Sequence, residues 1–83
     1  GVPQYEIQSS LIKNGIDMIS ALSDKTNFLK SNSEARRALK ENSISVNKIK
    51  VDEGYIIEKK DLISNKYIIL NKGKKNTYII KVI

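Results

Sequence analysis

Arg36 and Arg37 are the only arginines in a chain whose remaining basic residues are all lysines. A guanidinium group donates two parallel hydrogen bonds to phosphate oxygens and stacks on exposed bases, whereas a lysine ammonium acts as a point charge. Successive side chains on a helix are about 100° apart, so Arg36, Arg37 and Lys40 would share one side. This spacing predicts a cationic helix face that binds phosphate. The alternative is a solvated face in which Glu34 and Glu41 neutralise the arginines.

Residue types that commonly carry catalysis are scarce. The chain has no cysteine and no histidine, which excludes thiolate metal sites and the usual general base. Its close acidic pairs, Asp52 with Glu53 and Glu58 with Asp61, lie among lysines in a segment that we expect to be exposed. General acid catalysis needs a buried carboxyl with a raised pKa, which this pattern does not predict. The "NKGKK" stretch also lacks the first glycine and the Ser/Thr of a P-loop. We therefore predict no catalytic residue, metal site or cofactor site in this chain.

The positive charge is concentrated in two segments. The chain has a net charge of +6, and residues 30–50 carry six basic residues against two acidic ones. Residues 62–83 carry five lysines and no acid, whereas residues 51–61 have a net charge of −2. We expect the two basic segments to converge on one polyanion-binding face, although charge for solubility alone would give a similar count. Aromatic residues make up only 6% of the chain, so recognition of structured RNA is favoured over base stacking on single strands.

A helix that begins near residue 32 would carry the cationic face. Ser31 and Glu34 have the S-x-x-E spacing of a capping box, in which each side chain accepts a hydrogen bond from the other residue's backbone N–H. Ala35, Ala38 and Leu39 follow at the spacing of a buried stripe, which predicts that the basic side chains face outward.

The N-terminal part is expected to add one more helix. Ile16, Ile19 and Leu22 recur at helical spacing, which predicts a helix from about residue 16 to residue 25. Residues 1–10 are expected to be irregular, and Phe28 with Leu29 to plug the connection between the two helices.

The C-terminal half is expected to form strands. Ile44 and Val46 alternate with polar residues, which predicts a half-buried strand, and "NKIK" predicts a tight turn after it. The apolar runs at 67–70 and 77–83 are expected to pair through a lysine-rich loop at 71–76, with Tyr67 and Tyr78 in the core or in cross-strand packing.

These elements predict an α+β fold in which two N-terminal helices pack on a small, mostly antiparallel β-sheet. The 83 residues are enough for one small domain, which we place at 15–83 after a lead-in segment at 1–14. The first residue is glycine, so we expect a piece excised from a longer chain. No apolar run reaches the length of a membrane span, and the lack of cysteine is compatible with a reducing cytoplasm.

Two stretches carry a family resemblance. "FLKSNSEARRALKENSISVNKIKV" resembles the core of the RNA-binding domain named after small-subunit ribosomal protein four, the S-four-like or alpha-L RNA-binding motif. The opening "GVPQ", the stretch "GIDMISALSDKTNFLKS" and the close "YIILNKGKKNTYIIKVI" extend the likeness to the C-terminal domain of bacterial tyrosyl-tRNA synthetases. The resemblance covers nearly all of the chain.

The resemblance implies a function and a set of contacts. A parent enzyme would activate tyrosine with ATP in a catalytic domain outside this chain, through which it would also form a homodimer. It would act in the cytoplasm as a tyrosine-tRNA ligase, and this domain would hold tRNA(Tyr). Carried over by position, the RNA-binding residues would be Lys30, Arg36, Arg37, Lys40, Asn47, Lys48, Lys72, Lys74 and Lys75.

Two positions depart from the family pattern, and two other functions remain open. Asn42-Ser43 stands where a glycine is common, and asparagine tolerates the left-handed conformation that such a turn needs. Lys81 stands where arginine is common. The alternatives are an S-four-like domain of an RNA-modifying or ribosome-associated protein and, from a different class, an interaction module for an acidic protein.

Overall fold

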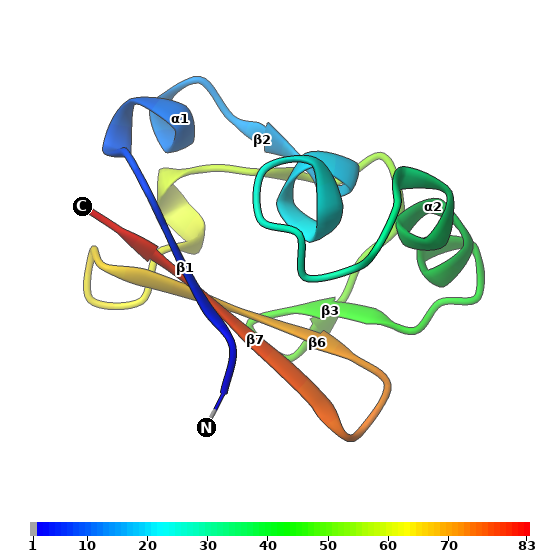
Figure 1. Cartoon of the computed structure of the whole chain (residues 1–83). Coiled ribbons are helices and arrows are strands. Elements are labelled where there is room, and N and C mark those ends of the chain that lie inside the picture. Colours follow the sequence, from blue (N-terminus) through cyan, green and yellow to red (C-terminus); the bar gives the residue numbers. More distant parts are fainter. Residues whose placement is uncertain (1) are drawn as a thin grey trace.

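A computed structural model describes residues 2–83, and its main element is a five-stranded sheet (Figure 1). The strands follow the spatial order β1-β7-β6-β3-β4, in which β1 is parallel to β7 and the other neighbours are antiparallel. The fold is therefore a small α+β domain with a mostly antiparallel sheet, as the sequence predicts. In chain order these strands are β1 (Gln4–Ile7), β3 (Ile44–Val46), β4 (Ile49–Lys50), β6 (Tyr67–Lys72) and β7 (Asn76–Val82).

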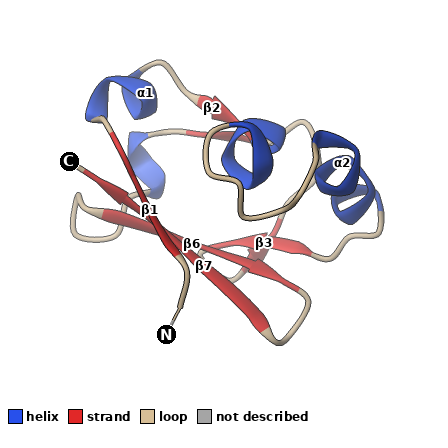
Figure 2. Ribbon diagram, in the orientation of Figure 1, coloured by secondary structure: helices blue, strands red, loops and turns tan. Residues whose placement is uncertain are grey.

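The helices lie on one face of this sheet and leave the other face uncovered (Figure 2). A short two-stranded sheet, β2 with β5, connects parts of the helical layer. The remaining elements are α1 (Ser9–Lys13), β2 (Ile16–Asp17), the π-helical turn η1 (Ser20–Asp24), α2 (Asn32–Lys40), β5 (Ile56–Ile57) and the single 3-10 turn η2 (Lys59–Asp61).

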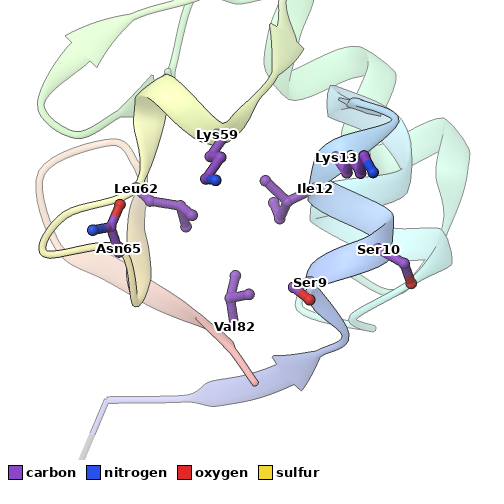
Figure 3. A pocket seen from close by; sticks show the side chains of 8 residues that line it. All are labelled: Ser9, Ser10, Ile12, Lys13, Lys59, Leu62, Asn65 and Val82. Carbon is purple, nitrogen blue, oxygen red and sulfur yellow. The ribbon is translucent and has the colours of Figure 1, made fainter.

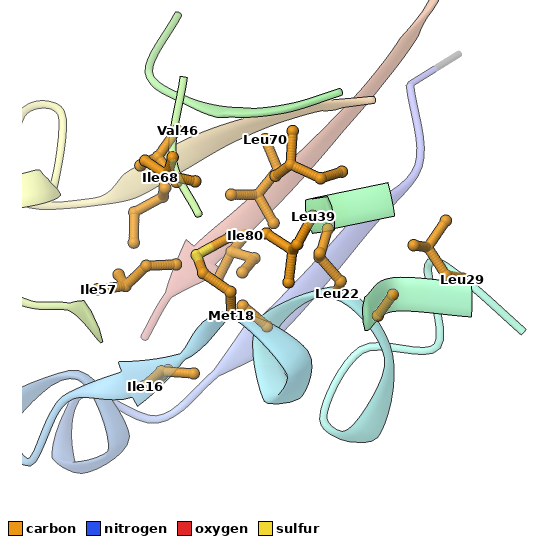
Figure 4. Close-up of a cluster of buried hydrophobic side chains, with 14 of the residues drawn as sticks. Ile16, Met18, Leu22, Leu29, Leu39, Val46, Ile57, Ile68, Leu70 and Ile80 are labelled. Carbon is orange, nitrogen blue, oxygen red and sulfur yellow. The ribbon is translucent and has the colours of Figure 1, made fainter. Parts of the chain in front are cut away.

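The core lies between the sheet and the helical layer (Figure 4). Ile68 and Leu70 of β6 are fully buried on this side, together with Ile80 of β7. Because side chains alternate along a strand, Ile69 and Asn71 point to the uncovered face. This alternation places two different surfaces at the end of the sheet where β6 turns into β7.

The expectation of an irregular segment at residues 1–10 is wrong for most of its length, and Gly1 lies outside the described residues. β1 occupies Gln4–Ile7 and α1 begins at Ser9. The Ile83 N–H donates to the Ile7 carbonyl and the Ser9 N–H donates to the Ile83 carbonyl, at 2.9 and 3.1 Å. Pairing with a strand at the far end of the chain therefore orders this segment.

The expected helix at 16–25 is also shorter and different in kind. Ile16 and Asp17 form β2, which pairs with Ile57 and Ile56 of β5. The turn η1 follows, and the Lys25 N–H donates to the carbonyl of Ser20, five residues earlier. The prediction for Phe28 and Leu29 is confirmed, because Leu29 is buried and the Phe28 ring stacks on Tyr78 with centroids 4.8 Å apart.

The helix α2 matches its prediction closely. Ser31 is its N-cap and accepts a hydrogen bond from the Glu34 N–H at 3.1 Å, and the stripe of Ala35, Ala38 and Leu39 is buried. Asn42 has a φ of 58°, as expected for the residue that replaces glycine. The second half of the capping box is wrong, since the Glu34 carboxylate accepts from the N–H of Lys30 rather than of Ser31.

The β6–β7 hairpin is longer than expected. Lys72 pairs with Asn76, so the turn contains only residues 73–75 and not the predicted loop at 71–76. Lys72 is therefore a strand residue. Tyr67 is 38% exposed and pairs with Lys81 across the strands, so it lies outside the core, whereas Tyr78 is partly buried and packs against the core as predicted.

Candidate nucleic-acid interface

The packing of α2 decides where its cations point. The buried alanine–leucine stripe fixes the rotation of the helix, and Arg36, Arg37 and Lys40 are all exposed on its other sides. Small alanines let the helix backbone pack closely against the core, so the backbone that carries the cationic side chains is held rigidly. The sequence prediction of an outward-facing cationic cluster on this helix is confirmed.

The two arginines have different surroundings. Arg36 Nε lies 3.7 Å from Glu53 Oε2, and both side chains are about half exposed. Such an exposed pair contributes about 0–1 kcal/mol and leaves most of the guanidinium donors free. The alternative pairing of Arg37 with Glu41 is absent from the ion pairs found within residues 2–83.

Arg37 lines a hollow between α2 and the hairpin, which we call the helix hollow. Glu34 holds its two walls together, because one carboxylate oxygen accepts from the Lys30 N–H and the other lies 3.6 Å from Lys72 Nζ. The hollow therefore gathers cations from the connection before α2, from α2 and from β6. Its lining residues are Lys30, Ser31, Ser33, Glu34, Arg37, Ala38, Glu41 and Lys72.

A second hollow lies on the uncovered face of the sheet, and we call it the sheet hollow. The Gly73 N–H donates to the Ser43 carbonyl at 2.7 Å, which holds the hairpin turn against the residues that follow α2. Among the described residues, three lysines and no acidic side chain line this hollow. Its lining residues are Asn42, Ser43, Ser45, Lys48, Lys50, Asn71, Gly73 and Lys74.

The two hollows adjoin at the hairpin. Lys72 lines the helix hollow, whereas Gly73 and Lys74 line the sheet hollow. The two basic segments therefore meet at one end of the sheet, but on both of its faces and not on the single face that the sequence predicts. Lys40 and Lys75 are exposed but line neither hollow.

Asn47 is placed differently from the other predicted contacts. Its Nδ2 donates to the Asp61 carbonyl at 2.6 Å, and its Oδ1 accepts from the Ile69 N–H at 3.0 Å. Both polar ends of the side chain are therefore used to join the β3–β4 turn to η2 and β6. Asn47 positions the turn that presents Lys48.

Sequence reasoning missed Lys50 and Asn71. Register places Lys50 beside Ser45 and Asn71 on the other side of Ser45, so the three side chains share the uncovered face. The only local signal was the alternation of Ile49 with Lys50, in a strand of two residues.

One acidic residue that was expected to be solvated has a structural role. Asp61 is half-buried, and one of its carboxylate oxygens accepts from the Tyr55 hydroxyl at 2.5 Å. This hydrogen bond, with burial and the charges of Asp61 and Glu58, raises the pKa of Tyr55 to about 12. The Asp61 carboxylate therefore anchors a loop and is already committed to a hydrogen bond.

The other end of β7 carries an apolar hollow. Ile12, Leu62 and Val82 point toward a shared space, with Lys13 and Lys59 also in the lining (Figure 3). Within residues 2–83 no group of three or more acidic, histidine or cysteine side chains could hold a metal ion. Among the described residues, no helix has the length and the apolar character needed to cross a membrane.

Comparison with known proteins gives a consistent result. Residues 1–80 match the family described as the tyrosine–tRNA ligase SYY-like C-terminal domain. The chain is 49% identical over 83 residues to a tyrosine–tRNA ligase of Flavobacterium johnsoniae, and 50% identical over 82 residues to that of Flavobacterium psychrophilum. It is 40% identical over 83 residues to a tyrosine–tRNA ligase of Porphyromonas gingivalis. These matches cover 99–100% of the chain but only 19% of each relative's length.

Proposed function

The chain belongs to the SYY-like C-terminal domain family of tyrosine–tRNA ligases, and from this premise we propose that it binds tRNA through the hairpin end of its sheet. The ligand is tRNA(Tyr), and the domain holds it for a catalytic domain elsewhere in a longer protein. Its contribution is affinity and placement, because a reacting end held near a catalytic site reacts as if at high local concentration.

The arrangement of cations supports this proposal. Six basic side chains line two adjoining hollows, and Arg36, Lys40 and Lys75 lie exposed on α2 and the hairpin turn. An RNA backbone that passes from the helix hollow around the hairpin to the sheet hollow would meet a cation at each step. Arg37 lines the helix hollow and has no ion-pair partner among residues 2–83, so its guanidinium can bind a phosphate through two hydrogen bonds.

The remaining functions follow the family. We propose that the whole protein is a homodimeric, cytoplasmic ligase that uses ATP to activate tyrosine, with ATP bound by its catalytic part. We also propose that the present domain has the S-four-like topology, in which α2, the Asn42 turn and β3 form the RNA-binding core.

A charge-matched pair of variants tests the binding surface. We expect Arg36→Ala combined with Arg37→Ala to weaken binding of a tyrosine tRNA transcript about tenfold or more, because charge-assisted hydrogen bonds to phosphate are lost. The control is Lys59→Ala combined with Lys60→Ala, which removes the same charge from the exposed turn η2. Affinities are measured by filter binding or fluorescence anisotropy.

The outcome separates a specific surface from net charge. Equal losses in the two variants would mean that only the total charge matters. Tight binding of an acidic protein in place of the tRNA would instead favour a protein-interaction module.

A further inference from the structure

The floor of the sheet hollow contains an unusual polar residue. Asn71 lies in the middle of the sheet, with Ser45 of β3 on one side and Thr77 of β7 on the other. Its neighbours along β6 on this face are apolar or aromatic, Ile69 and Tyr67. Asn71 is only 7% exposed, although it faces the side of the sheet that the helices leave uncovered.

Only half of the Asn71 amide has a partner. Its Nδ2 donates to Thr77 Oγ1 at 2.9 Å and lies 3.5 Å from the Asn76 carbonyl. Its Oδ1 is buried and accepts no hydrogen bond from any residue in 2–83. Exchanging the two amide atoms would set the oxygen against the Asn76 carbonyl, another acceptor, and would leave a buried N–H without an acceptor, so the present orientation is the better assignment. A buried acceptor without a donor is costly, and a ligand that donates a hydrogen bond removes that cost.

The rest of the hollow selects an anion. Lys48, Lys50 and Lys74 line it, and Lys50 Nζ already donates to the Asn42 carbonyl at 2.8 Å, which places that ammonium at the rim. The exposed lysine side chains exchange rotamers within nanoseconds, so they can turn toward a phosphate and open a way to the floor. The hollow therefore combines three exposed lysines with a lining residue, Asn71, whose buried amide oxygen has no hydrogen-bond partner among residues 2–83.

We propose that the sheet hollow binds one ribose–phosphate unit of RNA, with the lysines on the phosphate and Asn71 Oδ1 accepting a hydrogen bond from the ribose 2′-hydroxyl. The inference rests on the proposed function and adds a way to prefer RNA to DNA. A phosphate alone offers no donor, and deoxyribose lacks the hydroxyl, whereas a ribonucleotide supplies both groups together. Lys50, which the family resemblance does not include among the contacts, belongs to this subsite.

A double-mutant cycle between protein and RNA tests the proposal. Wild type and Asn71→Val, a residue suited to a strand, are titrated with tyrosine tRNA transcripts that carry 2′-hydroxyl or 2′-fluoro groups. One fluoro transcript is substituted at all pyrimidines and another at all purines, so that together they cover every nucleotide. Fluorine keeps the RNA-like sugar pucker but cannot donate a hydrogen bond.

We expect one of the two fluoro transcripts to bind wild type about three- to tenfold more weakly than the hydroxyl transcript, as for the loss of one hydrogen bond. Asn71→Val should bind the hydroxyl transcript with a similar loss and should show no further loss with fluorine. Lys50→Met should weaken hydroxyl and fluoro transcripts by the same factor, because it removes a phosphate contact only.

Two controls keep the result interpretable. Thr77→Val removes the partner of Nδ2 but leaves the Asn71 oxygen, so its sensitivity to fluorine should remain. Thermal unfolding by circular dichroism checks each fold, and Asn71→Ser replaces Asn71→Val if the latter does not fold.

Contrary outcomes separate the two proposals. Equal fluorine effects in wild type and the Asn71 variant would overturn the 2′-hydroxyl contact while leaving tRNA binding intact. If the Asn71 variant also binds every transcript more weakly than wild type by one common factor, Asn71 contacts another donor such as a base amine, and the 2′-hydroxyl contact is still overturned. Failure of wild type to bind any transcript would instead remove the proposed function.

Discussion

Lys48 has a left-handed backbone conformation, with a φ of 74°, at the second position of the turn between β3 and β4. Asn47, the first position, has a φ of 50°. Two residues with positive φ make a turn in which asparagine followed by glycine is strongly preferred. A lysine at this position therefore has a conformational cost that glycine would not have. The Lys48 side chain lines the sheet hollow.

Lys48→Gly should therefore separate stability from binding. We expect the variant to be more stable by about 0.5–1 kcal/mol, or roughly 2–8 °C in Tm, because glycine adopts positive φ without a Cβ penalty. Binding of tRNA should become several-fold weaker, since a phosphate contact is lost. Thermal unfolding and a binding titration measure the two effects.

Ser64→Gly is the matched control for Lys48→Gly. Ser64 also has a positive φ, of 54°, and is exposed, but it carries no charge and lines neither hollow. It should gain stability and leave tRNA binding unchanged. A Lys48→Gly variant that binds as tightly as wild type would remove Lys48 from the interface.

Tyr55 gives the domain a pH dependence at high pH. Its pKa is about 12 in the folded chain against an ordinary value of 10.0, chiefly because its hydroxyl donates to Asp61. The folded state thus keeps a proton that the unfolded state loses. The stability from this contact is complete below about pH 10 and is lost as the pH rises from about 10 to about 12.

Comparison with Tyr55→Phe isolates this effect from the titration of lysines. Across pH 10–12 the free energy of unfolding of wild type should fall more than that of the variant, by on the order of 1–3 kcal/mol. Urea unfolding at several pH values measures both curves. Parallel curves would show that the hydroxyl makes no contact that is specific to the folded state.

Among the elements, the C-terminal end of α2 connects the two hollows. Asn42, in the left-handed conformation, donates its N–H to the Leu39 carbonyl, and the Ser43 N–H donates to the Ala38 carbonyl, both at 3.1 Å. These two bonds form a Schellman motif, which satisfies carbonyls that the helix end would otherwise leave free. The motif turns the chain from α2 into β3 and places Ser43 against the hairpin.

Substitutions at Asn42 should follow the cost of a positive φ. Asn42→Gly should raise the free energy of unfolding by a few tenths of a kcal/mol, whereas Asn42→Ala should lower it by about 1 kcal/mol. Chemical denaturation measures both. Glu41→Ala, at the neighbouring exposed position with a negative φ, should change stability by less than about 0.5 kcal/mol, and equal effects at the two positions would contradict the motif.

The elements differ in how far the sequence could predict them. α2 was predictable because its cap, its buried stripe and its Asn42 terminus are all local signals. β1 was not, because Gln4 pairs with Ile79 at the other end of the chain and the strand has only four residues. The helix predicted at 16–25 was wrong for a related reason, because Ile16 pairs with β5 and so belongs to a strand and not to the helix.

The same distinction applies to the candidate site. The arginines and hairpin lysines could be found from composition and helical spacing. Lys50 and Asn71 could not, because they come from different strands and meet only through the register of both with β3. The sequence also could not show that both polar ends of the Asn47 side chain form hydrogen bonds, with the backbone of Asp61 and of Ile69.

For the whole molecule, the distribution of the charged residues is more informative than the net charge of +6. Six basic side chains line the two hollows at the hairpin end, whereas the hollow at the other end of β7 is walled by Ile12, Leu62 and Val82. That hollow has only two lysines, Lys13 and Lys59, in its lining, so the lining cations are concentrated at the hairpin end. A long polyanion is expected to bind mainly at the hairpin end, across both faces of the sheet.

The salt dependence of tRNA binding measures how many phosphates the cations of the domain neutralise. If about five cations neutralise phosphates, log K for tRNA should fall against log[salt] with a slope of roughly −3.5 to −4.5. Lys50→Met should make the slope shallower by about 0.7–0.9, as should Lys74→Met, because each removes one phosphate contact. Lys13→Met, in the apolar hollow, should leave the slope unchanged. A slope that is flat, or that responds equally to all three variants, would mean that the hairpin end is not where the RNA backbone lies.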